Sequence, residues 1–151
     1  MKKHKFTLVL FIVVVILLYV AYYNFSNNEK ITVNIKGHLF KTEIADNLKE
    51  QERGLSGRET MTDDQAMLFI FPNKTKRVFW MKDMNFNIDL LWIEDDQIVA
   101  YEKNMLAPEK DTPPSELLRY ASPPAVNKVL EIKAGLIDRL GIKVGDIIIS
   151  S

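Results

Sequence analysis

The chain has 151 residues, contains no cysteine, and carries 20 basic and 20 acidic side chains, for a formal net charge of +0. Without cysteine it can form no disulfide, no thiolate nucleophile and no thiolate metal site. No stripe of basic residues marks a nucleic-acid-binding surface, so we expect no nucleic-acid partner.

The N-terminal segment is the most apolar part of the chain. Residues 6–23, from Phe6 to Tyr23, read FTLVLFIVVVILLYVAYY and carry no charge. Since a helix rises about 1.5 Å per residue, a run of this length can just cross the roughly 30 Å hydrocarbon core of a bilayer. Lys2, Lys3 and Lys5 precede it, and positive charge stays on the cytoplasmic side of a membrane. The pattern therefore predicts a transmembrane anchor with its N-terminus inside.

A cleaved signal peptide is the alternative interpretation of this segment. Its apolar region is usually shorter, and here bulky residues occupy the place of a small-residue cleavage site. We therefore expect a single-pass cell-membrane protein in four parts. These are a cytoplasmic basic tail (1–5), the anchor (6–23), a linker (24–30) and an extracytoplasmic domain (31–151).

The first half of the predicted domain contains strands around one short helix. Residues 31–37 alternate apolar and polar side chains, as a half-buried strand does, and residues 38–45 continue the pattern. Asn47 and Glu50 have the spacing of a capping box, which predicts a helix that ends at Gly54. Residues 66–71 and 78–81 are apolar at every position or nearly so, which is typical of central strands covered on both faces.

The second half continues with hairpins and a long loop. Residues 88–93 and 98–101 flank an acidic turn and predict a hairpin. Residues 104–124 contain five of the six prolines and predict a long ordered loop with at most one helical turn. A strand at 126–133, a short helix at 135–140 closed by Gly141, and a last strand at 147–150 follow. The pattern predicts an α+β, mostly antiparallel domain, a partly closed barrel or sandwich with two short helices.

Asp89 is the most unusual charged residue of the predicted strands. It shares one strand face with Leu91 and Ile93, and a carboxylate there is costly unless it is paired. It could serve as an acid, base or ligand anchor, or as a structural partner of a cation or of backbone donors. Lys82 lies two residues after Trp80, where a cation beside a ring could bind a ligand, and it is also a natural partner for Asp89. We expect Glu131 to be solvated, because it alternates with Leu130 and Ile132 along its strand.

Arg53 and Arg58 bracket a glycine-rich turn, and arginine can bind a carboxylate or phosphate or tie a loop to a strand. The two histidines, His4 and His38, have no metal-ligand spacing, and no Ser-His-Asp set or phosphate loop is present. We therefore predict no metal, no cofactor and no catalytic residue. The residues that remain as a hypothetical ligand-binding set are Arg58, Trp80, Lys82 and Asp89.

Several short blocks, taken in order, carry a resemblance to a known family. They include ERGLSGR at 52–58, AMLFIFP at 66–72, FWMKD at 79–83, IDL at 88–90, VLEI at 129–132 and GIKVGD at 141–146. Together they resemble the uncharacterised DUF192 (UPF0127) family over residues 31–150. Ser56, Ala66 and the Asp83–Met84 pair depart from its usual pattern. The resemblance implies a compact β-rich domain that is commonly exported or anchored, and it carries over no catalytic residue.

Three classes of function remain open. The first is a non-catalytic module that binds an envelope glycan, peptide or small acid through Trp80, Lys82 and Arg58, since such sites combine aromatic surfaces with a few polar groups. The second is an accessory domain that docks onto an envelope protein. The third is a hydrolase or lyase that uses Asp89 with Lys82, although no nucleophile–base pair is visible.

Overall fold

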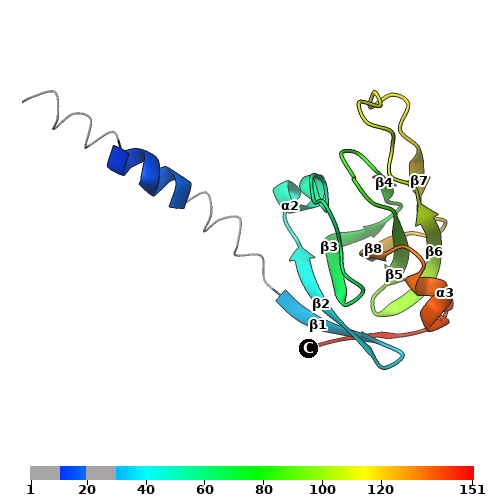
Figure 1. Ribbon diagram of the computed structural model, residues 1–151. Helices are drawn as coiled ribbons and strands as arrows, with labels where there is room; N and C mark the ends of the chain where they lie inside the picture. The colour runs from blue at the N-terminus through cyan, green and yellow to red at the C-terminus, as the bar shows by residue number, and fades with distance from the viewer. Residues whose placement is uncertain (1–10, 20–29) are drawn as a thin grey trace, which may run out of the picture.

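A computed structural model describes residues 11–19 and 30–151 (Figure 1). Residues 30–151 form one β-rich domain. Its strands are β1 (Lys30–Ile35), β2 (His38–Ala45), β3 (Gln65–Thr75), β4 (Val78–Trp80), β5 (Ile88–Glu94), β6 (Gln97–Met105), β7 (Arg119–Ala121), β8 (Val126–Lys133) and β9 (Ile148–Ser150). Its short helices are α2 (Leu48–Arg53) and α3 (Leu136–Leu140). The prediction of a β-rich domain with two short helices is confirmed.

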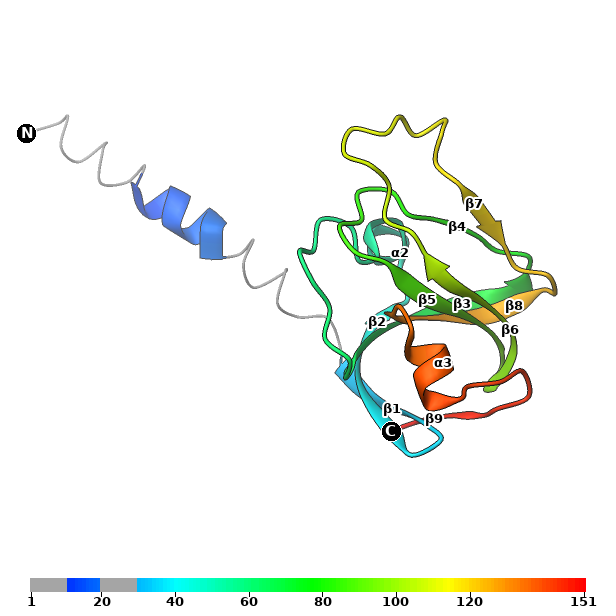
Figure 2. The same ribbon diagram turned by 45° about the vertical axis from the view of Figure 1, so that its right-hand side comes forward.

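Seven strands form one curled sheet in the order β6-β5-β8-β3-β2-β1-β9. Every neighbouring pair is antiparallel except β2 and β3, which are parallel. The two edge strands meet at one end, where Ile98 N donates to Asp146 O and Ile148 N donates to Asp96 O, both at 2.9 Å. The sheet is therefore a half-barrel whose two edge strands meet at one end. Helix α3 lies within its curve (Figure 2).

The central strands β3, β5 and β8 have apolar side chains on both faces, and each face has its own core. The inner core contains Val33, Ile35 and Phe40 of β1 and β2, and α3 covers it with Leu136 and Ile137. The outer core contains Met67, Phe69, Leu90, Trp92 and Val129 and is covered by Leu55, Met61, Met81 and Met84. Burial on both faces explains why β3 and β5 have almost unbroken apolar sequences.

Local signals set the bounds of α2. Asn47 accepts a hydrogen bond from Glu50 N at 3.1 Å, which confirms the predicted cap. Gly54 ends the helix with φ +49° and ψ −132°, and a Cβ atom there would lie 3.3 Å from Phe69 Cζ. Gln51 donates to the carbonyls of Ala45 and Ile70, so the helix is fastened to β2 and β3.

Two predictions about strands were wrong. Residues 78–81 do not form a central strand; β4 pairs only with β7, in a separate two-stranded sheet. Only alternate side chains of β4 point inward, so Val78 stays 58% exposed and Trp80 37% exposed. The proline-rich segment also contains β7, whose three residues were too few to form a recognisable alternating pattern.

The predicted anchor lies only partly within the described residues. Residues 11–19 form a helix, and the remaining positions of the predicted span, 6–10 and 20–23, are outside the described part. Within the described residues, no helix is both long and apolar enough to span a bilayer.

Candidate functional site

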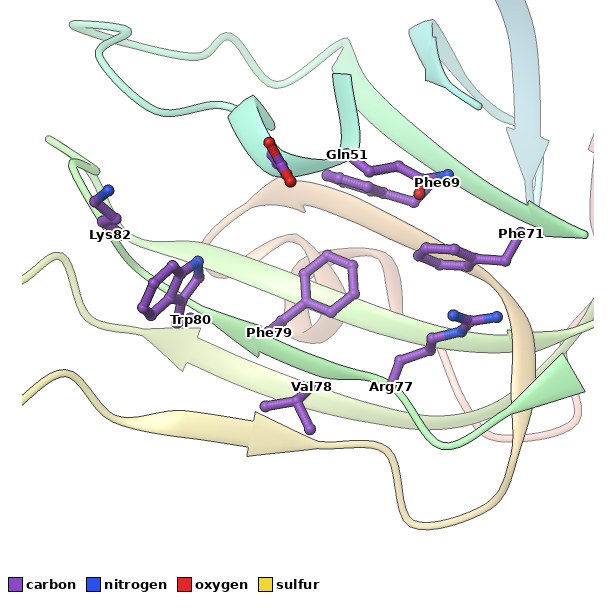
Figure 3. Close-up of a pocket in the computed structure, with 9 residues that line it drawn as sticks. Gln51, Phe69, Phe71, Arg77, Val78, Phe79, Trp80 and Lys82 are labelled. Carbon is purple, nitrogen blue, oxygen red and sulfur yellow. The ribbon is translucent and has the colours of Figure 1, made fainter. Parts of the chain in front are cut away.

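A groove of about 470 Å³ runs between α2 and β4 on the outer side of the sheet (Figure 3). One wall is α2, which is held in place by Gln51, and the other is β4 with the residues that flank it. Its lining residues come from three segments: Gln51, Glu52, Phe69, Phe71, Arg77, Val78, Phe79, Trp80 and Lys82. Trp80 and Lys82 were predicted to contribute to a binding site, and the structure places both in this groove.

Aromatic rings form most of the apolar surface of the groove. Phe79 points inward from β4 and meets Phe69 edge-on, with 4.9 Å between ring centroids. Phe79 also meets Trp92 edge-on, with 5.6 Å between ring centroids. Such edge-to-face contacts hold rings in fixed orientations. The groove floor is thus continuous with the outer core and is preorganised.

Cations lie against the rings at both ends of the groove. The Arg77 guanidinium lies 3.9 Å from the centroid of the Phe71 ring. Arg119 and the Lys82 ammonium lie 4.7 Å and 5.8 Å from the Trp80 ring. Arg119 reaches Trp80 because these two residues are directly opposite in the β4–β7 pair. The arrangement gives the groove aromatic surfaces bordered by positive charge.

A chamber of about 40 Å³ opens beside the groove, and Glu131 lines it. The expectation that Glu131 is solvated was wrong, because only 6% of the residue is exposed. Its Oε2 atom is buried and has no hydrogen-bond partner among the described residues. Burial raises the pKa of Glu131 to about 8, against the opposing effect of the nearby Arg58 charge. The carboxyl group is therefore mostly protonated at neutral pH.

Arg58, another predicted site residue, does not line the groove. Its guanidinium donates two hydrogen bonds to the Glu43 carboxylate, at 2.7 and 2.8 Å. These bonds hold the pKa of Glu43 below its usual value. Arg58 thus ties its loop to β2, and its charge acts on Glu131 from a distance.

The loop after α2, which lines the chamber, is hydrogen-bonded to the segment after β4. Ser56 Oγ donates to Lys82 O at 2.8 Å, and Gly57 N donates to Asp83 O at 2.8 Å. Asn85 Nδ2 donates to the Arg58 carbonyl at 2.9 Å. These bonds fix the distance between the two walls of the chamber.

Asp89 lies on the inner face of the sheet, away from the groove. It is 1% exposed, and its carboxylate accepts from Asn104 N at 2.8 Å and from Ile137 N at 2.9 Å. It thereby caps α3, whose own cap position, Gly135, has no side chain to do so. In the described part of the chain, no ion pair joins Lys82 to Asp89.

Sequence reasoning did not identify Glu131, Arg77 or Arg119 as residues of this site. One signal for Glu131 was available. It stands between the apolar residues Leu130 and Ile132, in a strand that is central and buried on both faces. Nothing in the sequence pairs Arg119 with Trp80, because the β4–β7 contact joins residues far apart in the chain.

The chemistry available at the site is binding through rings, cations and one neutral carboxyl group. Histidine, aspartate and glutamate side chains do not gather in groups of three that could hold a metal within residues 11–19 and 30–151. Lys82 contributes a positive charge, and Glu131 contributes a proton that it can donate in a hydrogen bond.

Comparisons with known proteins show one family and two related folds. The sequence model of the DUF192 family, described as "Uncharacterized ACR", matches residues 31–149. A crystal structure of a "putative transcription regulator" from Sinorhizobium meliloti 1021 is 29% identical with a TM-score of 0.72, and the match covers 82% of this chain and 95% of that one. A protein of unknown function from Novosphingobium aromaticivorans DSM 12444 is 28% identical with a TM-score of 0.67, over 81% of this chain and 84% of that one. No curated protein matches the chain.

Proposed function

The chain belongs to the DUF192 family, and we propose that this member is a non-catalytic binding module whose α2–β4 groove takes a small ring-shaped acid, such as an acidic sugar. The observation that carries the proposal is the pairing of aromatic rings with cations along one preorganised groove. Glycans, peptides and small acids were all open from the sequence. The groove favours the acid.

Size and shape support a small ligand. A groove of about 470 Å³ is within the range of sites for small molecules, which are usually about 300 to 1,000 Å³. Phe79 and Trp80 offer flat apolar surfaces on which the ring of a sugar can lie. Trp80 keeps 37% of its surface exposed, so its ring is accessible to a ligand.

Charge supports an acid over a base. Arg77, Lys82 and Arg119 lie against the rings of the groove, and Glu52 is the one acidic residue among the groove-lining residues. A carboxylate gains from these cations, whereas an ammonium group is repelled by them. Guanidinium groups also offer paired donors that match the two oxygens of a carboxylate.

Binding fits these residues better than a reaction. The enzymatic alternative needs Asp89 and Lys82 together, but the Asp89 carboxylate is occupied by two backbone amides on the other face of the sheet. The groove lining contains no histidine and no serine or threonine beside a base.

The test compares three sugars that share one ring and differ in charge: glucuronate, glucose and glucosamine. The full-length protein, held in a non-ionic detergent, is titrated with each sugar while the indole N–H signals of its two tryptophans are followed by NMR. We expect the Trp80 signal to shift saturably with glucuronate, more weakly with glucose and least with glucosamine.

Variants then locate the site. Trp80→Ala and Lys82→Gln should each weaken glucuronate binding by tenfold or more, measured by calorimetry. Lys143→Gln is the matched control, because Lys143 is an exposed lysine that does not line the groove. Equal affinity for glucuronate and glucosamine, or unchanged binding in both groove variants, would contradict the proposal. Specific co-purification of a membrane protein without sugar binding would instead support the accessory role.

We further propose that the domain is extracytoplasmic and anchored through residues 6–23. The support is the uncharged apolar run with three lysines before it. Protease added to intact cells should digest the domain, and the mature protein should retain its N-terminal segment. A mature N-terminus near residue 24 would show cleavage.

A further inference from the structure

We propose that the chamber beside the groove is a subsite in which the Glu131 carboxyl group donates a hydrogen bond to a carbonyl or hydroxyl oxygen of the ligand. This inference rests on the proposed function, because it assigns one polar group of the same ligand. It concerns a residue that the sequence had suggested to be solvated.

The geometry of the chamber points to one small oxygen-bearing group. Its volume of about 40 Å³ exceeds the roughly 10 to 15 Å³ that one water-sized group needs. Phe79, Trp80 and Met84 line its apolar side. Glu131 Oε2 is its buried polar atom without a partner among the described residues.

Gly54 keeps the chamber open. A Cβ atom at this position would lie 4.0 Å from Glu131 Oε2 and 3.3 Å from Phe69 Cζ. A side chain here would therefore occupy the space in front of the carboxyl group. The positive φ of Gly54 and the short distance from a Cβ atom to Phe69 both favour glycine at this position.

An unpartnered polar atom in a closed core is costly, and native proteins rarely leave one without a reason. A ligand oxygen would satisfy Glu131, and the ligand would gain a hydrogen-bond donor in surroundings that are apolar on one side. Protonated carboxyl groups in apolar surroundings are known to act as hydrogen-bond donors.

The charged groups around Glu131 set the conditions under which it keeps its proton. Arg58 acts on it from the loop, but Glu43 neutralises that guanidinium. Glu52 and Arg53 line the chamber from α2 with opposite charges. The cross-strand neighbours on β3 and β5 are Met67 and Leu90, which are uncharged. Burial therefore dominates, and the pKa of Glu131 is raised to about 8.

A ligand that combines a carboxylate for the groove cations with a neighbouring carbonyl or hydroxyl oxygen for Glu131 satisfies both parts of the site. Hydroxylated ring acids have this composition. The negative charge of such a ligand also favours the protonated form of Glu131, so its binding and the retention of the proton support one another.

The test uses acetone, a neutral oxygen acceptor that has neither ring nor charge. The full-length protein in detergent is titrated with acetone, and the Trp80 indole signal and the carboxyl signal of Glu131 are followed by NMR. The Glu131 signal is assigned by its absence in Glu131→Gln. We expect the Trp80 indole signal to shift saturably in the wild type and in Glu131→Gln, which keeps a donor. We expect at least a tenfold loss of affinity in Glu131→Met, which has none.

Dependence on pH provides a second readout that does not need Glu131→Met to fold. Wild-type affinity should fall about tenfold per pH unit above pH 8, while that of Glu131→Gln should stay level. No saturable shift, or equal affinity in the wild type and Glu131→Met, would overturn the inference. Since acetone has no charge to pair with the groove cations, failure of glucuronate binding would count against the proposed function alone.

Discussion

Replacement of Glu131 with glutamine should raise the stability of the domain relative to the wild type progressively as pH rises. The folded protein holds a proton on Glu131 up to about pH 8, whereas the unfolded chain releases it near the usual value of 4.5. Because the folded state binds the extra proton between these values, wild-type stability falls with rising pH in this window. The slope is about 1.4 kcal/mol per pH unit for one proton.

The size of the effect follows from that window. From pH 5 to pH 8 the free energy of unfolding of Glu131→Gln, relative to wild type, should increase by on the order of 4 kcal/mol and then level off. The other titratable groups are present in both proteins, so their contributions cancel in the difference. The absolute offset between the proteins can have either sign, because the glutamine amide also needs partners.

Denaturant unfolding followed by circular dichroism, at half-unit intervals from pH 5 to pH 9, measures this difference. A gap between the two proteins that stays constant with pH would refute the reasoning. It would mean that Glu131 ionises in the folded protein at the same pH as in the unfolded chain, and so is solvated after all.

Three further predictions concern stability, each measured by chemical denaturation. Gly54→Ala should cost about 1 to 3 kcal/mol, because Gly54 has φ +49° and a Cβ would lie 3.3 Å from Phe69 Cζ. The control is Gly37→Ala, which has φ +86° and no atom within 4 Å of the added Cβ, so that it measures backbone strain alone. An equal loss of stability in the two variants would contradict the effect of the Phe69 contact. Asp89→Ala should cost about 1 to 3 kcal/mol for each of the two backbone amides that it leaves unpaired, and an unchanged midpoint would show that Asp89 is solvated. Glu43→Gln should remove stability that the wild type has above pH 4.5 and loses as pH falls through the lowered pKa of Glu43; acid unfolding identical to wild type would refute this.

Much of the fold could be predicted from local patterns. The hairpin of β5 and β6, the strand β8 and the helix α2 with its Asn47 cap all follow from alternation, turn residues and capping. The half-barrel also follows in outline, because short strands that are mostly antiparallel must curl or stack to bury their apolar faces.

The errors came where tertiary contacts override the local pattern. The β4 sequence VFW has the composition of a central strand, yet it pairs only with β7 and exposes two of its side chains. Glu131 alternates as a solvent-facing residue would, but the outer face of β8 is covered by the loop after α2 and by β4. Alternation tells which residues share a face; it does not tell whether that face is covered.

The candidate site could be predicted in part. Trp80 and Lys82 lie in the groove because they belong to one short segment. Arg58 and Asp89 are engaged elsewhere, by Glu43 and by backbone amides. Arg119 could not be predicted, because only the long-range pairing of β4 with β7 brings it to Trp80.

The most direct test of the central claim is the position of a bound acidic sugar. Full-length protein is mixed with ¹³C-labelled glucuronate, and intermolecular nuclear Overhauser effects are recorded between the sugar and the aromatic protons of the protein. The account predicts contacts from the sugar ring to Trp80 and Phe79. Contacts confined to residues outside the α2–β4 groove would contradict it.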